Sequence, residues 1–396
     1  MKIWCICRNV WNNRVTWKHY SLERAAASFD NSLDLTIGIE EEFQILDADT
    51  LELTNRFEDL SAVAHKKLGT FVKGELIASE IEISTAKCES IAAAEADLTQ
   101  KRRLLAESAS ELGLKLGTTG THPFSDWKKQ RILDTHHYRE VEERVRYCAW
   151  HNLTYGMHTH VGVRGRERMI AVFNSLRGYM PAILALSANS PFSEGRYTYL
   201  HSTRAQIFTR SFPRGNIPGP FRDWDDYATF IDTLFVTNSI SEPTQVWWSL
   251  RPHPLFGTLE IRICDSQSDI RDTLAISALV VSLVARLSAD FDEGRALVVL
   301  NTREVDENIW RAARYGLAGN LADFNKRKEI PVTDIIRALV EFTGDMQEKL
   351  GIESYVSRIA EILDEGNGAQ KQIRLFEEKG DVAAVFSDLL DGSPII

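Results

Sequence analysis

Four short segments of the chain carry charged or imidazole side chains two residues apart. The pairs are Glu40 and Glu42, Glu80 and Glu82, His158 and His160, and Glu260 and Arg262. Carboxylate oxygens and imidazole nitrogens are ligands for divalent cations such as Mg²⁺ or Mn²⁺. Two carboxylates about 7 Å apart repel by about 2 kcal/mol at an effective dielectric constant of about 20, so carboxylates gathered in this way indicate a bound cation. If the four segments lie in one sheet, these eight residues form an acidic cup.

Each pair lies in a segment whose polar and apolar residues alternate, which is typical of a β-strand. The segments are residues 35–46, 75–85, 155–163 and 258–264. In the first segment, Ile37, Ile39 and Phe43 point to the face opposite that of Glu40 and Glu42. An antiparallel sheet with one solvated face alternates in the same way and needs no function. Such a face usually mixes Lys, Thr and Ser, whereas the predicted cup contains no lysine.

Apolar helices between these strands are expected to cover the other face of the sheet. Ser90 is a capping residue, and the apolar residues that follow it up to residue 113 keep helical spacing. Residues 166–188 and 269–289 are predicted to be helices, and the apolar run in the second is too short to cross a bilayer. Residues 197–221 are rich in Arg, Pro and Gly, which predicts an ordered loop over the site. The fold class predicted is α+β, with a curved, largely antiparallel sheet and helices packed on its outer face.

The composition narrows the class of protein. With 44% hydrophobic and 26% charged residues among 396, the chain has an ordinary globular composition, and we expect no membrane partner. A formal net charge of -10 argues against a nucleic-acid partner. Five scattered cysteines indicate neither a disulfide framework nor a zinc site, which favours a cytoplasmic location. Residues 1–34 are predicted to be a poorly ordered extension, with a helix over 22–29 as the alternative, and residues 35–396 a single domain.

Several longer motifs contain the paired residues. In chain order, they read G-I-E-E-E-F, E-I-E-I-S-T-A, G-T-H-P-F, G-M-H-T-H-V, L-S-A-N-S-P-F and G-T-L-E-I-R-I-C-D. Together they resemble the type 2 glutamate–cysteine ligase family, also called carboxylate–amine ligases, from about residue 35 to about residue 317. The resemblance implies a glutamine-synthetase-like fold and ATP-dependent amide-bond formation. The chain departs from the family pattern N-R-W-x-A-x-R-x-G-L at Ile309, which replaces the arginine.

The resemblance also implies roles for individual residues. Glu40, Glu42, Glu82, His158 and Glu260 would bind Mg²⁺ or Mn²⁺, and Arg262 would act in catalysis with Glu42 and Glu260. Arg204 and Arg210 match family arginines and are predicted to bind substrate, with an ion pair that only holds the loop as the alternative. Glu80 and His160 are predicted to contact substrate or to support a metal ligand. Because the chain has no Walker-type motif, ATP would be held through metal ions and arginines.

The predicted function is that of an ATP- and Mg²⁺-dependent ligase with glutamate–cysteine ligase activity, which forms γ-glutamylcysteine through an acyl phosphate. A metal-dependent hydrolase is the first alternative, because the same carboxylates and histidines can activate water. A degenerate metal- or nucleotide-binding protein is the second. The predicted partners are small molecules, namely ATP, an amino acid and an amine. We expect the protein to be a homo-oligomer such as a homodimer.

Overall fold

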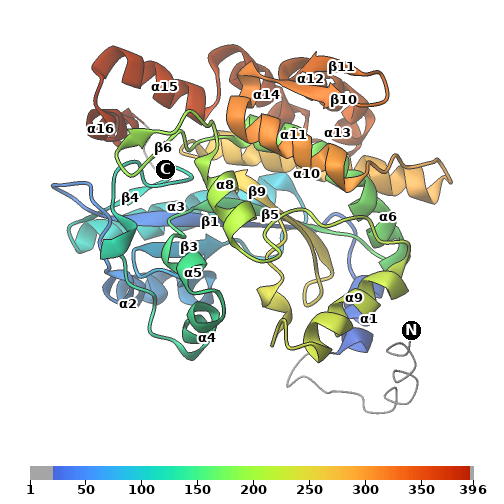
Figure 1. Cartoon of the computed structure of the whole chain (residues 1–396), viewed down its shortest axis with the longest axis horizontal. Coiled ribbons are helices and arrows are strands. Elements are labelled where there is room, and N and C mark those ends of the chain that lie inside the picture. Colours follow the sequence, from blue (N-terminus) through green and yellow to red (C-terminus); the bar gives the residue numbers. More distant parts are fainter. Residues whose placement is uncertain (1–20, 393–396) are drawn as a thin grey trace, which may run out of the picture.

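One antiparallel sheet lies at the centre of the protein (Figure 1), whose computed structural model describes residues 21–392. The order of its main strands is β2 (Val72–Lys73), β3 (Glu80–Ser84), β1 (Ile37–Asp47), β5 (Gly156–Gly162), β9 (Thr258–Asp265) and β8 (Leu250–His253), and β4 (Leu114–Gly117) also pairs with β1. All these pairings are antiparallel. The predicted α+β class with a largely antiparallel sheet is confirmed.

The register of the sheet places the chemical residues side by side. Glu42 lies opposite Glu82 on β3, and Glu40 lies opposite His158 on β5. His160 lies opposite Glu260 on β9. Since residues two apart on a strand share a face, this register gathers the four predicted pairs on one side of the sheet.

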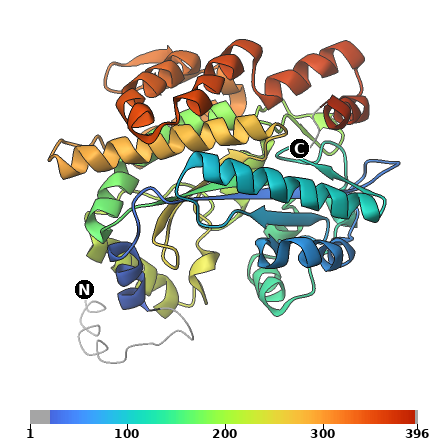
Figure 2. The same ribbon diagram turned by 180° about the vertical axis from the view of Figure 1, so that it is seen from behind.

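Long helices cover the apolar side of the sheet, as expected. Figure 2 shows α3 (Ile91–Glu111) lying across the strands, with α10 (Ile270–Asp292) beside it. The Ser90 hydroxyl accepts a hydrogen bond from the Ala93 amide and so begins α3 where predicted. Both α10 and the stretch Arg166–Ser187 are long and apolar enough to cross a membrane, but most of each is buried inside the fold. The α10 helix is therefore longer than the apolar run read from the sequence, and it forms part of the core.

One charged pair interrupts the apolar side. Glu41 points away from the cup, and Arg102 of α3 donates from Nε to Glu41 Oε2 at 2.6 Å. The Thr273 hydroxyl of α10 donates to Glu41 Oε1 at 2.8 Å. Glu41 and Arg102 are both fully buried. The ion pair therefore ties the central strand to two covering helices, which the alternating pattern alone did not predict.

The remaining elements form the rim of the cup and the outer layers. Between β1 and β5 these are α2 (Phe57–Leu68), η1 (Gly69–Phe71), η2 (Trp127–Lys129), α4 (His136–Val145) and α5 (Tyr147–Trp150). Between β5 and β8 they are α6 (Arg166–Leu176), η3 (Arg177–Tyr179), α7 (Met180–Ser187), β6 (Phe192–Ser193), β7 (Arg196–Tyr197), α8 (Thr203–Ser211), α9 (Trp224–Val236) and η4 (Pro243–Gln245).

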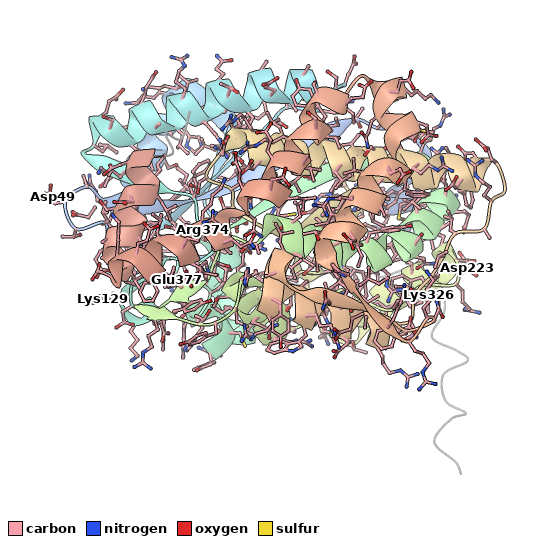
Figure 3. The ribbon with its side chains drawn as sticks, turned by 90° about the horizontal axis from the view of Figure 1, so that it is seen from above. Asp49, Lys129, Asp223, Lys326, Arg374 and Glu377 are labelled. Carbon is pink, nitrogen blue, oxygen red and sulfur yellow. The ribbon has the colours of Figure 1, made fainter. Side chains whose placement is uncertain are left out.

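The C-terminal quarter of the chain forms a separate, mainly helical layer on the outer side of α10 and α7 (Figure 1). It consists of α11 (Thr302–Tyr315), η5 (Gly316–Ala318), β10 (Asn320–Asp323), β11 (Lys328–Pro331), α12 (Val332–Phe342), α13 (Gly344–Leu350), α14 (Glu353–Glu365), α15 (Gly368–Lys379) and α16 (Val382–Gly392). Figure 3 shows this layer from above, with Lys326 of the β10–β11 turn at one end and Arg374 of α15 toward the other.

Two segments differ from the sequence-based expectation. Residues 22–30 of the predicted poorly ordered extension form the helix α1 (Leu22–Asp30), because Phe29 is fully buried and packs on Trp224. Residues 1–20 lie outside the described residues. The predicted loop over the site contains α8, which begins where the Ser202 hydroxyl accepts a hydrogen bond from the Ala205 amide. The Arg-, Pro- and Gly-rich composition of this segment therefore predicted a loop where the chain forms a short helix.

Candidate active site

A cavity of about 520 Å³ lies on the polar face of the sheet. The eight cup residues form its floor, and α4, α8 and the turn between β8 and β9 form its walls. Of the residues predicted from the sequence, the cavity is lined by Glu40, Glu42, Glu80, Glu82, His158, His160, Arg204, Glu260 and Arg262. Arg210 does not line it and is exposed at the end of α8. The structure therefore brings together every predicted site residue except Arg210.

Two groups of ligand atoms meet at Glu40. Glu40, Glu82 and His158 form one group, and Glu40, His160 and Glu260 form the other, each with its ligand atoms within 4.8 Å of one another. His158 Nδ1 lies 3.3 Å from Glu40 Oε2, and His160 Nε2 lies 3.6 Å from the same oxygen. The Nε2 atoms of both histidines are buried and make no hydrogen bond to a described residue. Buried, unpartnered imidazole nitrogens beside carboxylates fit a divalent cation such as Mg²⁺ or Mn²⁺.

The carboxylates of the cup differ in their electrostatic environment. Burial would raise the pKa of Glu40, but His160 and His158 hold this pKa well below its usual value. Burial raises the pKa of Glu82, and the neighbouring Glu40 raises it further. The pKa of Glu80 is raised by burial and by Glu42. The β3 side of the cup therefore carries repulsion between carboxylates that a cation would relieve.

Two arginines hold Glu260. Arg251 Nε donates to Glu260 Oε2 at 2.7 Å, and Arg262 Nη1 donates to Glu260 Oε1 at 2.6 Å. Burial would raise the pKa of Glu260, but these guanidinium groups keep it well below its usual value. As a metal ligand, Glu260 would share its oxygens with both arginines. Arg262 Nε is buried and makes no hydrogen bond to a described residue, which leaves a donor available inside the cavity.

Arg204 lies at the other end of the cavity, on the first turn of α8. Its Nη1 and Nη2 atoms donate to the carbonyl oxygens of Ile263 and Arg262, at 3.2 and 3.1 Å. Its buried Nε atom has no hydrogen-bond partner among the described residues. A Cβ atom at Gly156 would lie 2.2 Å from Arg204 Nη2, so only glycine lets the guanidinium pack on β5. A buried guanidinium that makes no ion pair within the described chain is suited to an anionic ligand.

Several residues of the cavity were not predicted from the sequence. Lys73 Nζ lies 3.4 Å from Glu82 and 3.8 Å from Glu40, where it offsets part of their charge. Lys73 belongs to a two-residue strand, which is too short to show any periodicity. Burial and Glu42 raise the pKa of the nearby Glu75 to about 7. Arg251 also went unassigned, although it lies directly opposite Glu260 in the register.

Other histidine and tryptophan side chains in and near the cavity have clear contacts. His122 fixes a loop, since its Nε2 atom lies 2.9 Å from the Leu51 carbonyl oxygen. Trp247 lines the cavity, whereas the neighbouring Trp248 is in the core. His137 also lines the cavity, and its Nδ1 atom lies 2.6 Å from Glu242 Oε1.

Solved structures with a similar fold are ligases. The structure is similar to the glutamate–cysteine ligase (gshA) of Francisella tularensis in complex with AMP, with a TM-score of 0.67, 13% identity, and coverage of 91% of this chain and 88% of that one. It is also similar to a bifunctional glutathione synthetase from Pasteurella multocida, with a TM-score of 0.65, 12% identity, and coverage of 94% of this chain and 53% of that one. These likenesses show the fold, which is that of the glutamine-synthetase-like ligases.

The sequence comparisons identify the family. The model of glutamate-cysteine ligase family 2 (GCS2) matches residues 36–388, which extends beyond the region marked by the motifs. Proteins named "Putative glutamate--cysteine ligase 2" are 37% identical over 358 residues in Solibacter usitatus and 39% identical over 362 residues in Sorangium cellulosum. The matches cover 90% and 91% of this chain and 93% and 96% of those proteins. Fold and site together therefore define a carboxylate–amine ligase. The chain belongs to glutamate-cysteine ligase family 2.

Proposed function

We propose that this ligase is ATP- and Mg²⁺-dependent and joins the γ-carboxylate of glutamate to the amine of cysteine through an acyl phosphate. The observation that carries the proposal is the pair of ligand groups that share Glu40, in a cavity that Arg204 and Arg262 also line with buried Nε atoms that have no hydrogen-bond partner among the described residues. The substrates are those in the names of the family and of the relatives. The AMP complex of the Francisella tularensis enzyme supports a nucleotide as co-substrate.

The residues of the cup would have different roles in binding the metal ions and the phosphoryl group. Glu40, Glu42, Glu82, His158 and Glu260 would hold Mg²⁺, which screens the repulsion between the phosphates of ATP and the substrate carboxylate. Arg262 would donate from its free Nε atom to the phosphoryl group while Glu260 fixes the orientation of its guanidinium.

Arg204 would bind the carboxylate of an amino-acid substrate at the other end of the cavity, through its free Nε atom. Glu80 and His160 would support the neighbouring ligands. Arg210 lies outside the cavity, so the structure gives no contact through which it would bind substrate.

The reaction would take place in two steps, phosphoryl transfer and amide-bond formation. A γ-carboxylate oxygen of glutamate attacks the γ-phosphorus of ATP, and ADP leaves with the bond electrons. The amine nitrogen of cysteine then attacks the acyl carbon, an amide bond forms, and phosphate leaves as the amine loses a proton. Both steps bring anions together, so the positive groups around the cup are needed throughout. We also propose a cytoplasmic location, which suits a reaction that uses ATP and a free thiol, and a homo-oligomeric state.

The test measures ADP and phosphate release with Mg²⁺, ATP and pairs of amino acids, and compares the wild type with Glu42→Gln. This change removes a cup charge with almost no change of shape, so turnover should fall by about 100-fold or more. The Gly156 amide can still donate to the glutamine carbonyl, so the melting temperature should stay within a few degrees. Glu89→Gln, at an exposed site outside the cavity, is the control and should keep full turnover.

The competing functions give different results in the same assay. A hydrolase would release product without ATP, and a binding protein would bind nucleotide without turnover. Wild-type protein that forms no ADP with any amino-acid pair, and that shows no Mg²⁺-dependent nucleotide binding, would contradict the proposal.

A further inference from the structure

An aromatic ring lies at the mouth of the cavity, in the turn between β8 and β9. Phe256 lines the cavity, yet 59% of its surface is exposed. Exposing a ring of this size gains nothing for folding, because burying it would contribute about 1.5–3 kcal/mol. Other aromatic rings line the cavity, but Phe208 and Phe212 are buried and Trp247 is half-buried, whereas Phe256 is mostly exposed.

The exposed ring is held in a fixed orientation. His253 stacks on one face of Phe256, with the ring centroids 4.2 Å apart and the planes at 13°. The His160 ring meets it at 66°, with the centroids 5.7 Å apart. The Phe256 amide donates to His253 Nδ1 at 3.3 Å, which fixes the backbone beneath the ring. One aromatic face is thus covered by an imidazole, and the opposite face is the exposed one.

The turn that carries Phe256 is braced by the end of α1 and by the residue Ser32 that follows it. Ser32, which follows α1, donates from its hydroxyl to the Gly257 carbonyl oxygen at 2.7 Å. Gly257 has a φ of 65°, and a Cβ atom there would lie 2.3 Å from the Ser28 carbonyl oxygen. The end of α1 therefore packs directly against this turn.

Phe256 lies beside the second ligand group of the cup, which consists of Glu40, His160 and Glu260. His160, which touches the Phe256 ring, has its Nε2 atom 3.6 Å from Glu40 and 3.8 Å from Glu260. His160 pairs with Gly38 near the start of β1, whereas Arg204 packs on Gly156, whose amide donates to Glu42 further along β1. Phe256 and Arg204 therefore lie at different ends of the cavity, with the ligand groups between them.

We propose that Phe256 is a stacking platform for the base of a nucleoside triphosphate whose phosphates lie over the cup. The inference rests on the proposed use of ATP and adds where the base binds. Aromatic stacking accepts any base, because every base has a π-face, so the ligand class is a nucleoside triphosphate. The end that contains Arg204 then remains for the amino-acid substrate, and the two reactants meet above Glu40.

The test uses two probes that share their phosphates but not their base. Calorimetric titration with Mg²⁺ measures the affinity for ATP and for inorganic tripolyphosphate, in the wild type and in Phe256→Ala. Loss of one stacked base weakens binding by about 5- to 150-fold, so ATP affinity should fall by a factor in this range while tripolyphosphate affinity stays the same. Phe256→Tyr keeps the ring and should restore the affinity for ATP. Because the ring is mostly exposed, Phe256→Ala should melt within a few degrees of the wild type.

Each other outcome points to a different cause. If Phe256→Ala leaves ATP affinity unchanged, the platform is wrong and the proposed function stands. An equal loss for both probes means that Phe256 only supports His160, which also contradicts the platform. A smaller assembly in light scattering for Phe256→Ala, with unchanged ATP affinity, assigns the ring to an interface between copies of the chain. Wild-type protein that binds neither probe contradicts the proposed function together with the platform.

Discussion

At the scale of single residues, two neighbouring carboxylates show how a strand separates structure from chemistry. Glu42 points into the cavity, where it contributes to the repulsion that raises the pKa of Glu80. Glu41 points to the opposite face, where Arg102 and Thr273 satisfy both of its oxygens. The same side chain therefore has opposite energetic roles at adjacent positions. The repulsion between cup carboxylates opposes folding, whereas the buried pair ties β1 to its covering helices.

This contrast leads to a matched prediction. Glu41→Gln leaves the Arg102 charge fully buried without its carboxylate, which should lower the free energy of unfolding by about 3–5 kcal/mol. The remaining folded protein should keep its turnover, because Glu41 does not line the cavity. Glu42→Gln should instead lose turnover while its free energy of unfolding changes little. Denaturant unfolding and ADP release, measured on both variants, check this, and similar melting of the two variants would contradict it.

At the scale of secondary structure, the length of an element determined whether its strand pattern could be predicted from the sequence. Four strands of five to eleven residues carried alternating patterns, so their shared polar face could be predicted. Arg251 and Lys73 lie on strands of four and two residues, where alternation cannot be recognised. The α8 helix was predicted to be a loop because its flanks are rich in Pro and Gly. Its capping residue, Ser202, was the available signal.

The cap of α8 also gives a prediction for an element that positions a site residue. Ser202 accepts from the Ala205 amide and donates to Asp265 Oδ1 at 2.9 Å. Ser202→Ala removes both contacts, which should cost about 1–3 kcal/mol and loosen the turn that carries Arg204. We therefore expect a raised KM for the amino-acid substrate with little change in KM for ATP.

A second helix cap serves as the control for this prediction. Ser90→Ala removes the equivalent contact at α3, on the other side of the sheet, and should lower stability without changing either KM. If Ser202→Ala and Ser90→Ala have the same kinetic constants, the cap of α8 does not position Arg204.

At the scale of the whole molecule, two buried histidines join the sheet region to the C-terminal layer. His122 packs on Phe386 of α16, with the ring centroids 5.0 Å apart. His201 lies against Gly316, which follows α11. Burial lowers the pKa of His122 to about 3 and that of His201 to about 4. Both rings are therefore neutral in the folded protein at neutral pH, and protonation would disrupt contacts between the layers.

These pKa shifts predict how stability depends on pH. The unfolded chain binds a proton at each histidine near pH 6.5, whereas folded His122 resists protonation down to about pH 3. The free energy of unfolding therefore has its full value above pH 6.5 and decreases as the pH falls from 6.5 toward 3. For one such histidine, the decrease at pH 5 is about 2 kcal/mol. Protonation is opposed locally as well, because His122 Nδ1 accepts from the Ser125 amide at 2.9 Å and cannot also carry a proton toward it.

The measurement is denaturant unfolding at pH 7 and pH 5. His122→Gln cannot be protonated, so it should be less stable than the wild type at pH 7 but should lose about 2 kcal/mol less between the two pH values. His136→Gln, at a histidine whose side chain is 90% exposed, controls for the substitution. The buried carboxylates of the cup also respond to pH, but they are the same in both variants and cancel in the comparison. Equal losses for the wild type and His122→Gln would show that protonation of His122 does not couple the layers to pH.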